Sequence, residues 1–232
     1  MGKGSFISPE QRSGIRARVE PIALAMSRAG LTPNMLTLIG FGIASIGGVL
    51  AAVEWWVLAG VVATAGAGFD MFDGAVARAT GQVSKLGAFM DSTFDRWGEG
   101  VVYLGIVIGS TRAGFDLGAW LATAALVSAF MVSYTRAKSE SLGFSTGTGM
   151  AAIGFAPREV RTVILGIAVV GAGIFGVTPE LFDLGSLILA IGLGLIALLA
   201  TITVIQRIRF VTSQDPNAEP TDTGHTQETP HS

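Results

Sequence analysis

Cysteine is absent from this chain of 232 residues, and the only two histidines, His225 and His231, lie in a polar stretch near its end. The lack of cysteine excludes disulfides, thiolate nucleophiles and cysteine-ligated metals, and the position of the histidines argues against a Ser–His or Cys–His catalytic pair. Charged residues are also scarce, at 14% of the chain, and the mean hydropathy is +0.59. A soluble domain of this composition would expose too much apolar surface, so the sequence predicts an integral membrane protein.

The two ends of the chain are polar. Residues 1–30 contain no apolar stretch followed by a cleavage site, so they do not resemble a secretory signal peptide. Within them, apolar residues recur at near-helical spacing over residues 13–28, which predicts an amphipathic helix on the membrane surface; a short helix without lipid contact is the alternative. The composition of residues 212–232 predicts a disordered cytoplasmic tail.

Between the polar ends, six apolar segments predict six transmembrane helices. Five of them are free of charge, and the third is apolar except for the four ionisable residues near its start. The sequence therefore predicts an all-α integral membrane bundle of six transmembrane helices over residues 31–211, with an N-terminal amphipathic surface helix. The segments are residues 31–53, 55–69, about 86–111, 117–135, 162–179 and 184–206.

The distribution of basic residues predicts the orientation. If the amino terminus is cytoplasmic, all of the 15 lysines and arginines except Arg112 fall on the cytoplasmic side or at that end of a helix. We therefore expect a multi-pass protein of the cell (inner) membrane with both termini in the cytoplasm. Thr32-Pro33 predicts a capped start for the first span, and Ala156-Pro157 predicts the same for the fifth.

Four aspartates lie where the second span ends and the third begins. A bilayer core needs about 20 residues of helix, so the second span is long enough only if its helix continues through Asp70 and Asp73. These two residues are three apart, and Asp91 and Asp95 are four apart, so each pair lies on one helical face. The short connection, residues 80–85, predicts that the two helices are antiparallel neighbours.

Ionisable side chains inside spanning segments are energetically expensive and are therefore candidates for function. Four carboxylates in a low-dielectric site repel one another unless cations neutralise them. Ligands that offer only oxygen favour hard divalent cations, and two such ions would polarise a phosphoryl group. The carboxylates therefore favour Mg²⁺, Mn²⁺ or Ca²⁺ over Zn²⁺. We expect Mg²⁺ or Mn²⁺, with two ions, at the cytoplasmic end of the bundle.

Three other interpretations of the aspartates are open. A buried salt-bridge network with Arg78 and Arg96 would leave two of the four acids unbalanced. A cation-coupled membrane transporter would use the same residues, but its site is expected near the bilayer midplane rather than at one end of the helices. A non-catalytic lipid-binding protein gives no reason for the spacing of the carboxylates.

The spacing resembles the signature of the CDP-alcohol phosphotransferases, D-x-x-D-G-x-x-A-R-x(8)-G-x-x-x-D-x-x-x-D. The likeness covers roughly residues 15–210 and implies a six-span enzyme that moves a substituted phosphate from a CDP-linked donor to an alcohol and releases CMP. It also implies a homodimer. Every fixed position of the signature is matched, by Asp70, Asp73, Gly74, Ala77, Arg78, Gly87, Asp91 and Asp95.

The resemblance implies roles for individual residues. All four aspartates bind metal, and Asp95 also removes the proton from the acceptor hydroxyl, a role within reach of a carboxylate. The segment Thr32–Thr37 is similar to the family's stretch beside the CDP site, although alone it would be an ordinary capped helix start. The implied contacts to the CDP-lipid are Asn34, Met35, Leu36, Thr37, Gly74, Arg78, Ser84 and Gly87.

The acceptor is expected to be a phosphorylated polyol. Three stretches, Ser133–Glu140, Arg158–Arg161 and Gln206-Arg207, are similar to elements of prokaryotic members that use inositol phosphate, with Glu159 one place early and Asn34 where those members carry Asp. A dianionic phosphate suits a basic pocket, whereas the positive-inside bias alone would also place basic residues here. The expected phosphate contacts are Ser133, Arg136, Lys138, Arg158, Arg161 and Arg207.

The sequence therefore predicts transfer of a phosphatidyl group from CDP-diacylglycerol to inositol 1-phosphate, which gives phosphatidylinositol phosphate and CMP. The second choice of acceptor is glycerol 3-phosphate, which would give phosphatidylglycerol phosphate. An uncharged acceptor would need fewer basic residues.

Overall fold

A computed structural model describes residues 21–144, 154 and 156–214, apart from the side chains of Asp70 and Met71. This part of the chain is helical and contains no strand, which confirms the all-α prediction for it; residues 21–28 are also helical. Most of residues 1–30, and the tail from residue 215, lie outside the described residues, so the surface helix and the disordered tail stay predictions. The helices are α2 (Pro33–Ala52), α3 (Trp56–Gly68), α4 (Asp70–Ala79), α5 (Lys85–Arg112), α6 (Asp116–Ser141), α7 (Arg158–Phe175) and α8 (Leu184–Thr212).

Local capping explains where several helices begin. The Thr32 hydroxyl accepts a hydrogen bond from the Met35 N–H at 3.3 Å, and Pro33 opens α2, as the sequence predicts. Pro157 precedes the first residue of α7. The start of α5 is capped by Ser84, whose hydroxyl accepts from the Gly87 N–H at 3.0 Å. Ser84 was expected to contact the donor, and here it has a structural partner.

Four helical segments are long and apolar enough to cross a membrane: Pro33–Ala52, Trp56–Ala79, Asp116–Ser141 and Leu184–Thr212, among the described residues. The second joins α3 and α4, with only Phe69 between them, so the predicted continuation of this helix is confirmed. Helix α5 has 28 residues but carries four ionisable groups in its first half, and α7 has 18 residues with three charged residues at its start. Six spans therefore stay a prediction.

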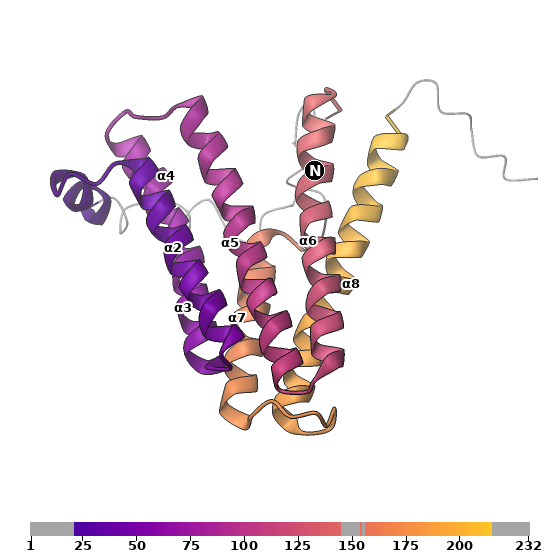
Figure 1. The fold of residues 1–232 in the computed structure, drawn as a ribbon. Helices are drawn as coiled ribbons and strands as arrows, with labels where there is room; N and C mark the ends of the chain where they lie inside the picture. The colour runs from indigo at the N-terminus through magenta and orange to yellow at the C-terminus, as the bar shows by residue number, and fades with distance from the viewer. Residues whose placement is uncertain (1–20, 145–153, 155, 215–232) are drawn as a thin grey trace, which may run out of the picture.

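The helices form a closed ring of neighbours. Helix α2 packs on α3, α3 on α7, α7 on α8, α8 on α6, α6 on α5, and α5 again on α2. Helix α4 packs mainly on α2, outside the ring. The prediction that α4 and α5 pack directly on each other is wrong, because each packs chiefly on α2. The helices approach one another at one end and splay at the other, where α4 lies and α5 begins (Figure 1).

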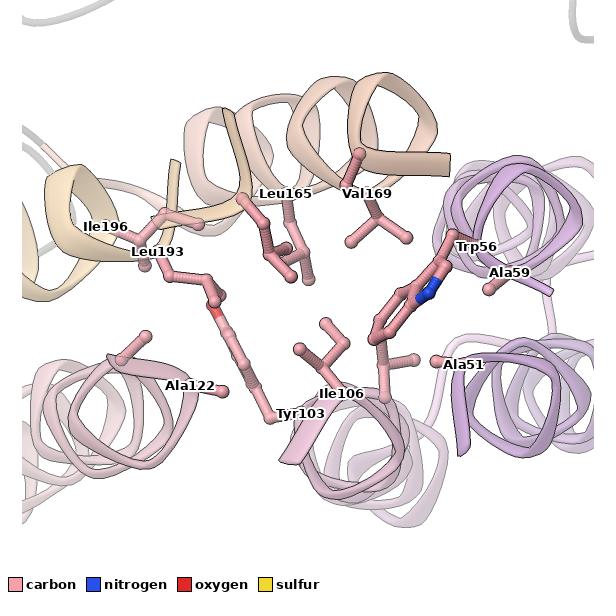
Figure 2. Close-up of a cluster of buried hydrophobic side chains, with 14 of the residues drawn as sticks. Ala51, Trp56, Ala59, Tyr103, Ile106, Ala122, Leu165, Val169, Leu193 and Ile196 are labelled. Atoms are coloured by element: carbon pink, nitrogen blue, oxygen red, sulfur yellow. The ribbon is translucent and has the colours of Figure 1, made fainter. Parts of the chain in front are cut away.

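Apolar side chains from every helix of the ring meet in its middle. Trp56, Tyr103, Ile106, Leu165 and Leu193 point into this core, and alanines fill the spaces between them (Figure 2). The dense packing of large and small side chains fixes how the helices lie relative to one another.

Glycines bring α2 and α5 into backbone contact. A Cβ atom on Gly105 would lie 1.9 Å from the carbonyl oxygen of Gly48, and one on Gly48 would lie 2.6 Å from that of Val101. Small residues at helix interfaces allow such close approach in membrane proteins. Because α5 carries Asp91 and Asp95, this contact sets their distance from α2.

Substitution Gly105→Ala should destabilise the fold, because the added methyl group forces α2 and α5 apart. We expect the free energy of unfolding to fall by about 1–3 kcal/mol, the usual range for overpacking. The matched control is Gly42→Ala on α2, where a Cβ would meet nothing within 4 Å. Thermal unfolding in detergent measures both; equal unfolding temperatures for the two variants would contradict the close contact.

Candidate active site

Asp73 on α4 is held by a residue of α2. The Asp73 side chain is buried, and its Oδ2 accepts a hydrogen bond of 2.6 Å from the Thr37 hydroxyl. The same hydroxyl lies 3.2 Å from the carbonyl oxygen of Pro33, one turn earlier in α2. Thr37 was expected to contact the donor; the structure shows that it orients one of the predicted metal ligands.

Asp95 on α5 faces two arginines. Its Oδ2 lies 2.7 Å from Nη1 of Arg158 on α7 and 3.4 Å from Nη2 of Arg96. It also lines a small pocket together with Thr37 and Phe41 of α2, among others. Since Thr37 holds Asp73 and borders the same pocket as Asp95, it stands between the carboxylates of α4 and α5. Asp91 lies one turn before Asp95 and is half-buried.

The donor chemistry of the aspartates suits Mg²⁺ or Mn²⁺, since carboxylate oxygen is the preferred ligand of hard cations. Within the described residues, no three acidic or histidine side chains lie close enough together to hold a metal ion. The side chain of Asp70, the fourth predicted ligand, lies outside the described residues. The two-ion site therefore stays a prediction.

The residues expected to contact the donor surround the starts of α2 and α5. A Cβ atom on Gly87 would lie 3.1 Å from Oγ of Ser84 and 3.5 Å from Oδ1 of Asn34, so these three residues lie together. Leu36 is fully buried against Ala23 and Val76, which leaves its side chain a packing role.

Two further expected donor contacts lie on α4. A Cβ atom on Gly74 would lie 3.2 Å from Nη1 of Arg78, so the Arg78 side chain passes over this glycine. Arg78 and Met35 are exposed, and both are therefore accessible to a ligand.

Arg161, an expected acceptor contact, is buried in a bidentate ion pair. Its Nε and Nη2 donate to the two carboxylate oxygens of Glu99, each at 3.0 Å, and its Nη1 donates to the carbonyl oxygen of Ala156 at 2.8 Å. Arg96 lies 3.6 Å from Glu99 and donates to the hydroxyl of Ser133 at 2.8 Å.

Glu99 and Arg96 were not among the predicted site residues. One signal could have found Glu99: it is ionisable, lies within a predicted span, and follows Asp95 by one helical turn.

The other expected acceptor contacts differ in exposure. Arg207 is buried and donates to the carbonyl oxygen of Val132. Arg136 itself is exposed and pairs with Glu140 at 2.9 Å. Lys138 is exposed as well. The structure therefore brings Arg158, Arg161 and Arg207 inside, and leaves Arg136 and Lys138 at the surface of α6.

A larger pocket lies inside the ring, between α2, α3, α5 and α7, with about 540 Å³ of empty space including its opening. Glu99, Arg158, Arg161 and Thr162 line its polar end, and apolar residues such as Ile106 line the other. The site thus has a carboxylate part at α4 and α5 and an arginine part at α7, joined by the contact between Asp95 and Arg158.

Comparison with known proteins identifies the family of this chain. The family model of the CDP-alcohol phosphatidyltransferases matches residues 30–198. The chain belongs to this family. It is therefore an enzyme of phospholipid biosynthesis, as its aspartate spacing predicts.

Among relatives, archaetidylinositol phosphate synthase of Pyrococcus horikoshii is 38% identical over 202 residues, which cover 85% of this chain and 92% of that protein. Phosphatidylinositol phosphate synthase of Cutibacterium acnes is 34% identical over 206 residues, which cover 85% and 93%.

The crystal structure of phosphatidylinositol phosphate synthase of Mycobacterium tuberculosis with CDP-DAG bound is similar, with a TM-score of 0.72, 28% identity, and 86% and 96% of the two chains covered. The same enzyme in complex with manganese and citrate gives a TM-score of 0.71, with 28% identity and 86% and 91% covered.

Replacement of Thr37 by valine should weaken use of the divalent ion, because Asp73 loses the hydroxyl that orients it. A partner of this kind typically changes metal affinity about 10- to 100-fold. The Mn²⁺ concentration that gives half-maximal CMP release should rise accordingly.

The control is Thr123→Val on α6, which removes a hydroxyl that donates to the carbonyl oxygen of Ala119, one turn earlier in the same helix. If both variants need the same Mn²⁺ concentration as the wild type, Thr37 does not orient a metal ligand.

Proposed function

We propose that the enzyme transfers a phosphatidyl group from CDP-diacylglycerol to inositol 1-phosphate and releases CMP. The observation that carries the proposal is the 2.7 Å contact between Asp95 and Arg158. This contact supports the proposal because a reaction between a CDP-lipid and a phosphorylated alcohol needs a base close to the group that binds the phosphate of the alcohol. The relatives whose names mention inositol phosphate support this acceptor.

In the reaction, the acceptor hydroxyl oxygen attacks the phosphorus that carries the lipid, and the bond from that phosphorus to the bridging oxygen of CMP breaks. Asp95 takes the proton of the hydroxyl, and CMP leaves with the bridging oxygen. Divalent ions held by Asp70, Asp73, Asp91 and Asp95, two Mg²⁺ or Mn²⁺ in our proposal, would neutralise charge on the diphosphate. The manganese complex of the M. tuberculosis enzyme supports this cofactor.

The arginines form the proposed phosphate site. Guanidinium groups suit a phosphate dianion because they donate in a planar fork. Glycerol 3-phosphate, which carries the same dianion, is the second candidate. The relatives agree on an inositol phosphate in their names and differ in the lipid, archaetidyl in one and phosphatidyl in another.

We further infer that the protein crosses the cell (inner) membrane six times, with both termini and the site in the cytoplasm, and forms a homodimer. The splayed end of the ring, where α5 begins, would face the cytoplasm (Figure 1). Site residues at one end of their helices suit an enzyme that meets a soluble substrate there, whereas a transporter site is expected near the midplane.

Substitution Asp95→Asn should greatly slow CMP release, because the amide cannot accept the hydroxyl proton. General bases contribute about 10²- to 10⁴-fold, so we expect a loss of that size in kcat with CDP-lipid binding partly retained. The control is Asp116→Asn, at the start of α6 on the opposite end of the bundle. Turnover close to that of the wild type would remove Asp95 from the base role.

An acceptor screen tests the substrate. Purified protein with CDP-diacylglycerol and Mg²⁺ or Mn²⁺ should release CMP with inositol 1-phosphate, to a lesser extent with glycerol 3-phosphate, and not with inositol, serine or choline. A basic site favours the phosphorylated compounds because it gains charge-assisted hydrogen bonds. Product from an unphosphorylated alcohol alone would refute the phosphate site.

A further inference from the structure

Glu99 is a carboxylate inside the helix bundle that neither the aspartate signature nor the proposed chemistry uses. Only 8% of its side chain is exposed, and it lies one turn beyond Asp95 on α5. Both of its oxygens accept hydrogen bonds from Arg161 of α7 at 3.0 Å, and its Oε2 lies 3.6 Å from Nη1 of Arg96. One acid therefore holds arginines from two helices.

Arg161 depends on this acid for its position. Its side chain is 1% exposed, so its charge has almost no access to water. Three of its N–H groups are taken, two by Glu99 and one by Ala156, which fixes the plane of the guanidinium. A buried charge that loses its partner is strongly destabilised, so without Glu99 the Arg161 side chain would leave this position for a more hydrated one.

Arg96 connects Glu99 with two expected site residues, Asp95 and Ser133. Its guanidinium lies 3.4 Å from the Asp95 carboxylate and donates to the Ser133 hydroxyl at 2.8 Å. Arg158 also contacts Asp95, and Arg161 also contacts Glu99, so each of the two acids lies against two arginines. Three cations can remain together here because two acids lie among them.

Glu99 also borders empty space beside the arginines of the proposed phosphate site. It lines the polar end of the larger pocket together with Arg158 and Arg161. Arg158 reaches from there to Asp95 at 2.7 Å. Two of the arginines expected to bind the acceptor phosphate, Arg158 and Arg161, therefore each have an acid partner on α5, at positions 95 and 99.

We propose that Glu99 is a positioning residue for acceptor recognition: it holds Arg161 and Arg96 so that the phosphate of the polyol meets a preformed set of guanidinium groups. The proposal rests on the proposed function, since it assigns Glu99 a role in binding a phosphorylated acceptor. It predicts an effect on acceptor affinity and not on the chemical step, because Glu99 is neither the proposed base nor one of the residues expected to bind metal or the CDP-lipid.

Two effects oppose each other when Glu99 loses its charge. Removal of a negative charge near the phosphate favours binding, and loss of the fixed Arg161 disfavours it. The displacement of Arg161 should have the larger effect on binding, because a buried arginine without an anion moves away and takes its own positive charge from the site. We therefore expect weaker acceptor binding in Glu99→Gln.

The test is a steady-state analysis of Glu99→Gln in the full-length protein, with CMP release followed while inositol 1-phosphate is varied. KM for inositol 1-phosphate should rise about 10-fold or more, while kcat and KM for CDP-diacylglycerol change by less than about threefold. A purely structural role would lower the fraction of active enzyme, and hence kcat, without a change in KM for the acceptor.

The double variant Glu99→Gln/Arg161→Gln separates stability from recognition. Removal of both partners leaves no buried charge alone, so the unfolding temperature should recover while KM for the acceptor stays high. Recovery of KM together with stability would overturn the proposal. The matched control is Glu54→Gln, which breaks the exposed pair with Arg112 at the other end of the bundle and should leave both quantities unchanged.

The outcomes also distinguish this inference from the proposed function. If the wild type responds to a phosphorylated polyol and Glu99→Gln has an unchanged or lower KM for it, the role of Glu99 is wrong and the proposed function stands. If the wild type uses only unphosphorylated alcohols, the proposed acceptor fails and the role of Glu99 fails with it.

Discussion

The need to give every charge inside an apolar bundle a partner governs this structure. Water cannot stabilise an ion there, so each ionised side chain must meet an opposite charge or a hydrogen-bond donor. The partners come from different helices: Arg158 and Arg161 of α7 meet Asp95 and Glu99 of α5. Helices α5 and α7 are not adjacent members of the ring, so the long arginine side chains connect them across its interior.

Helix α2 brings α3, α4 and α5 together on the other side of the site. It packs on α3, α4 and α5, and glycines allow it to approach α3 and α5 closely; a Cβ on Gly47 would lie 2.7 Å from the backbone nitrogen of Ala63. Thr37 therefore stands beside both Asp73 and the pocket at Asp95. The small residues of the sequence thus determine the packing, and the packing brings separate helices together at one site.

Local features of the sequence predicted much of this architecture. The cap at Thr32, the continuation of the helix past Phe69 and the helical class follow from residue types and spacing, and the aspartate spacing identified the family. The packing of α4 did not follow, because the short connection at residues 80–85 suggested that α4 packs directly on α5 and gave no sign that both pack chiefly on α2. The partners of Arg161 and Arg207 could not be predicted either, since positive-inside bias and phosphate binding both explain basic residues at helix ends.

The spacing of Asp95 and Glu99 has a consequence for how related enzymes can diverge. Both carboxylates lie on one face of α5, a single turn apart, and both contact arginines of α7. Any rotation or sliding of α5 would displace the two together, so a new acceptor cannot be accommodated by moving this helix without disturbing Asp95, the proposed proton acceptor. Acceptor preference is therefore freer to change through substitutions on α6, α7 and α8, while α5 stays in place.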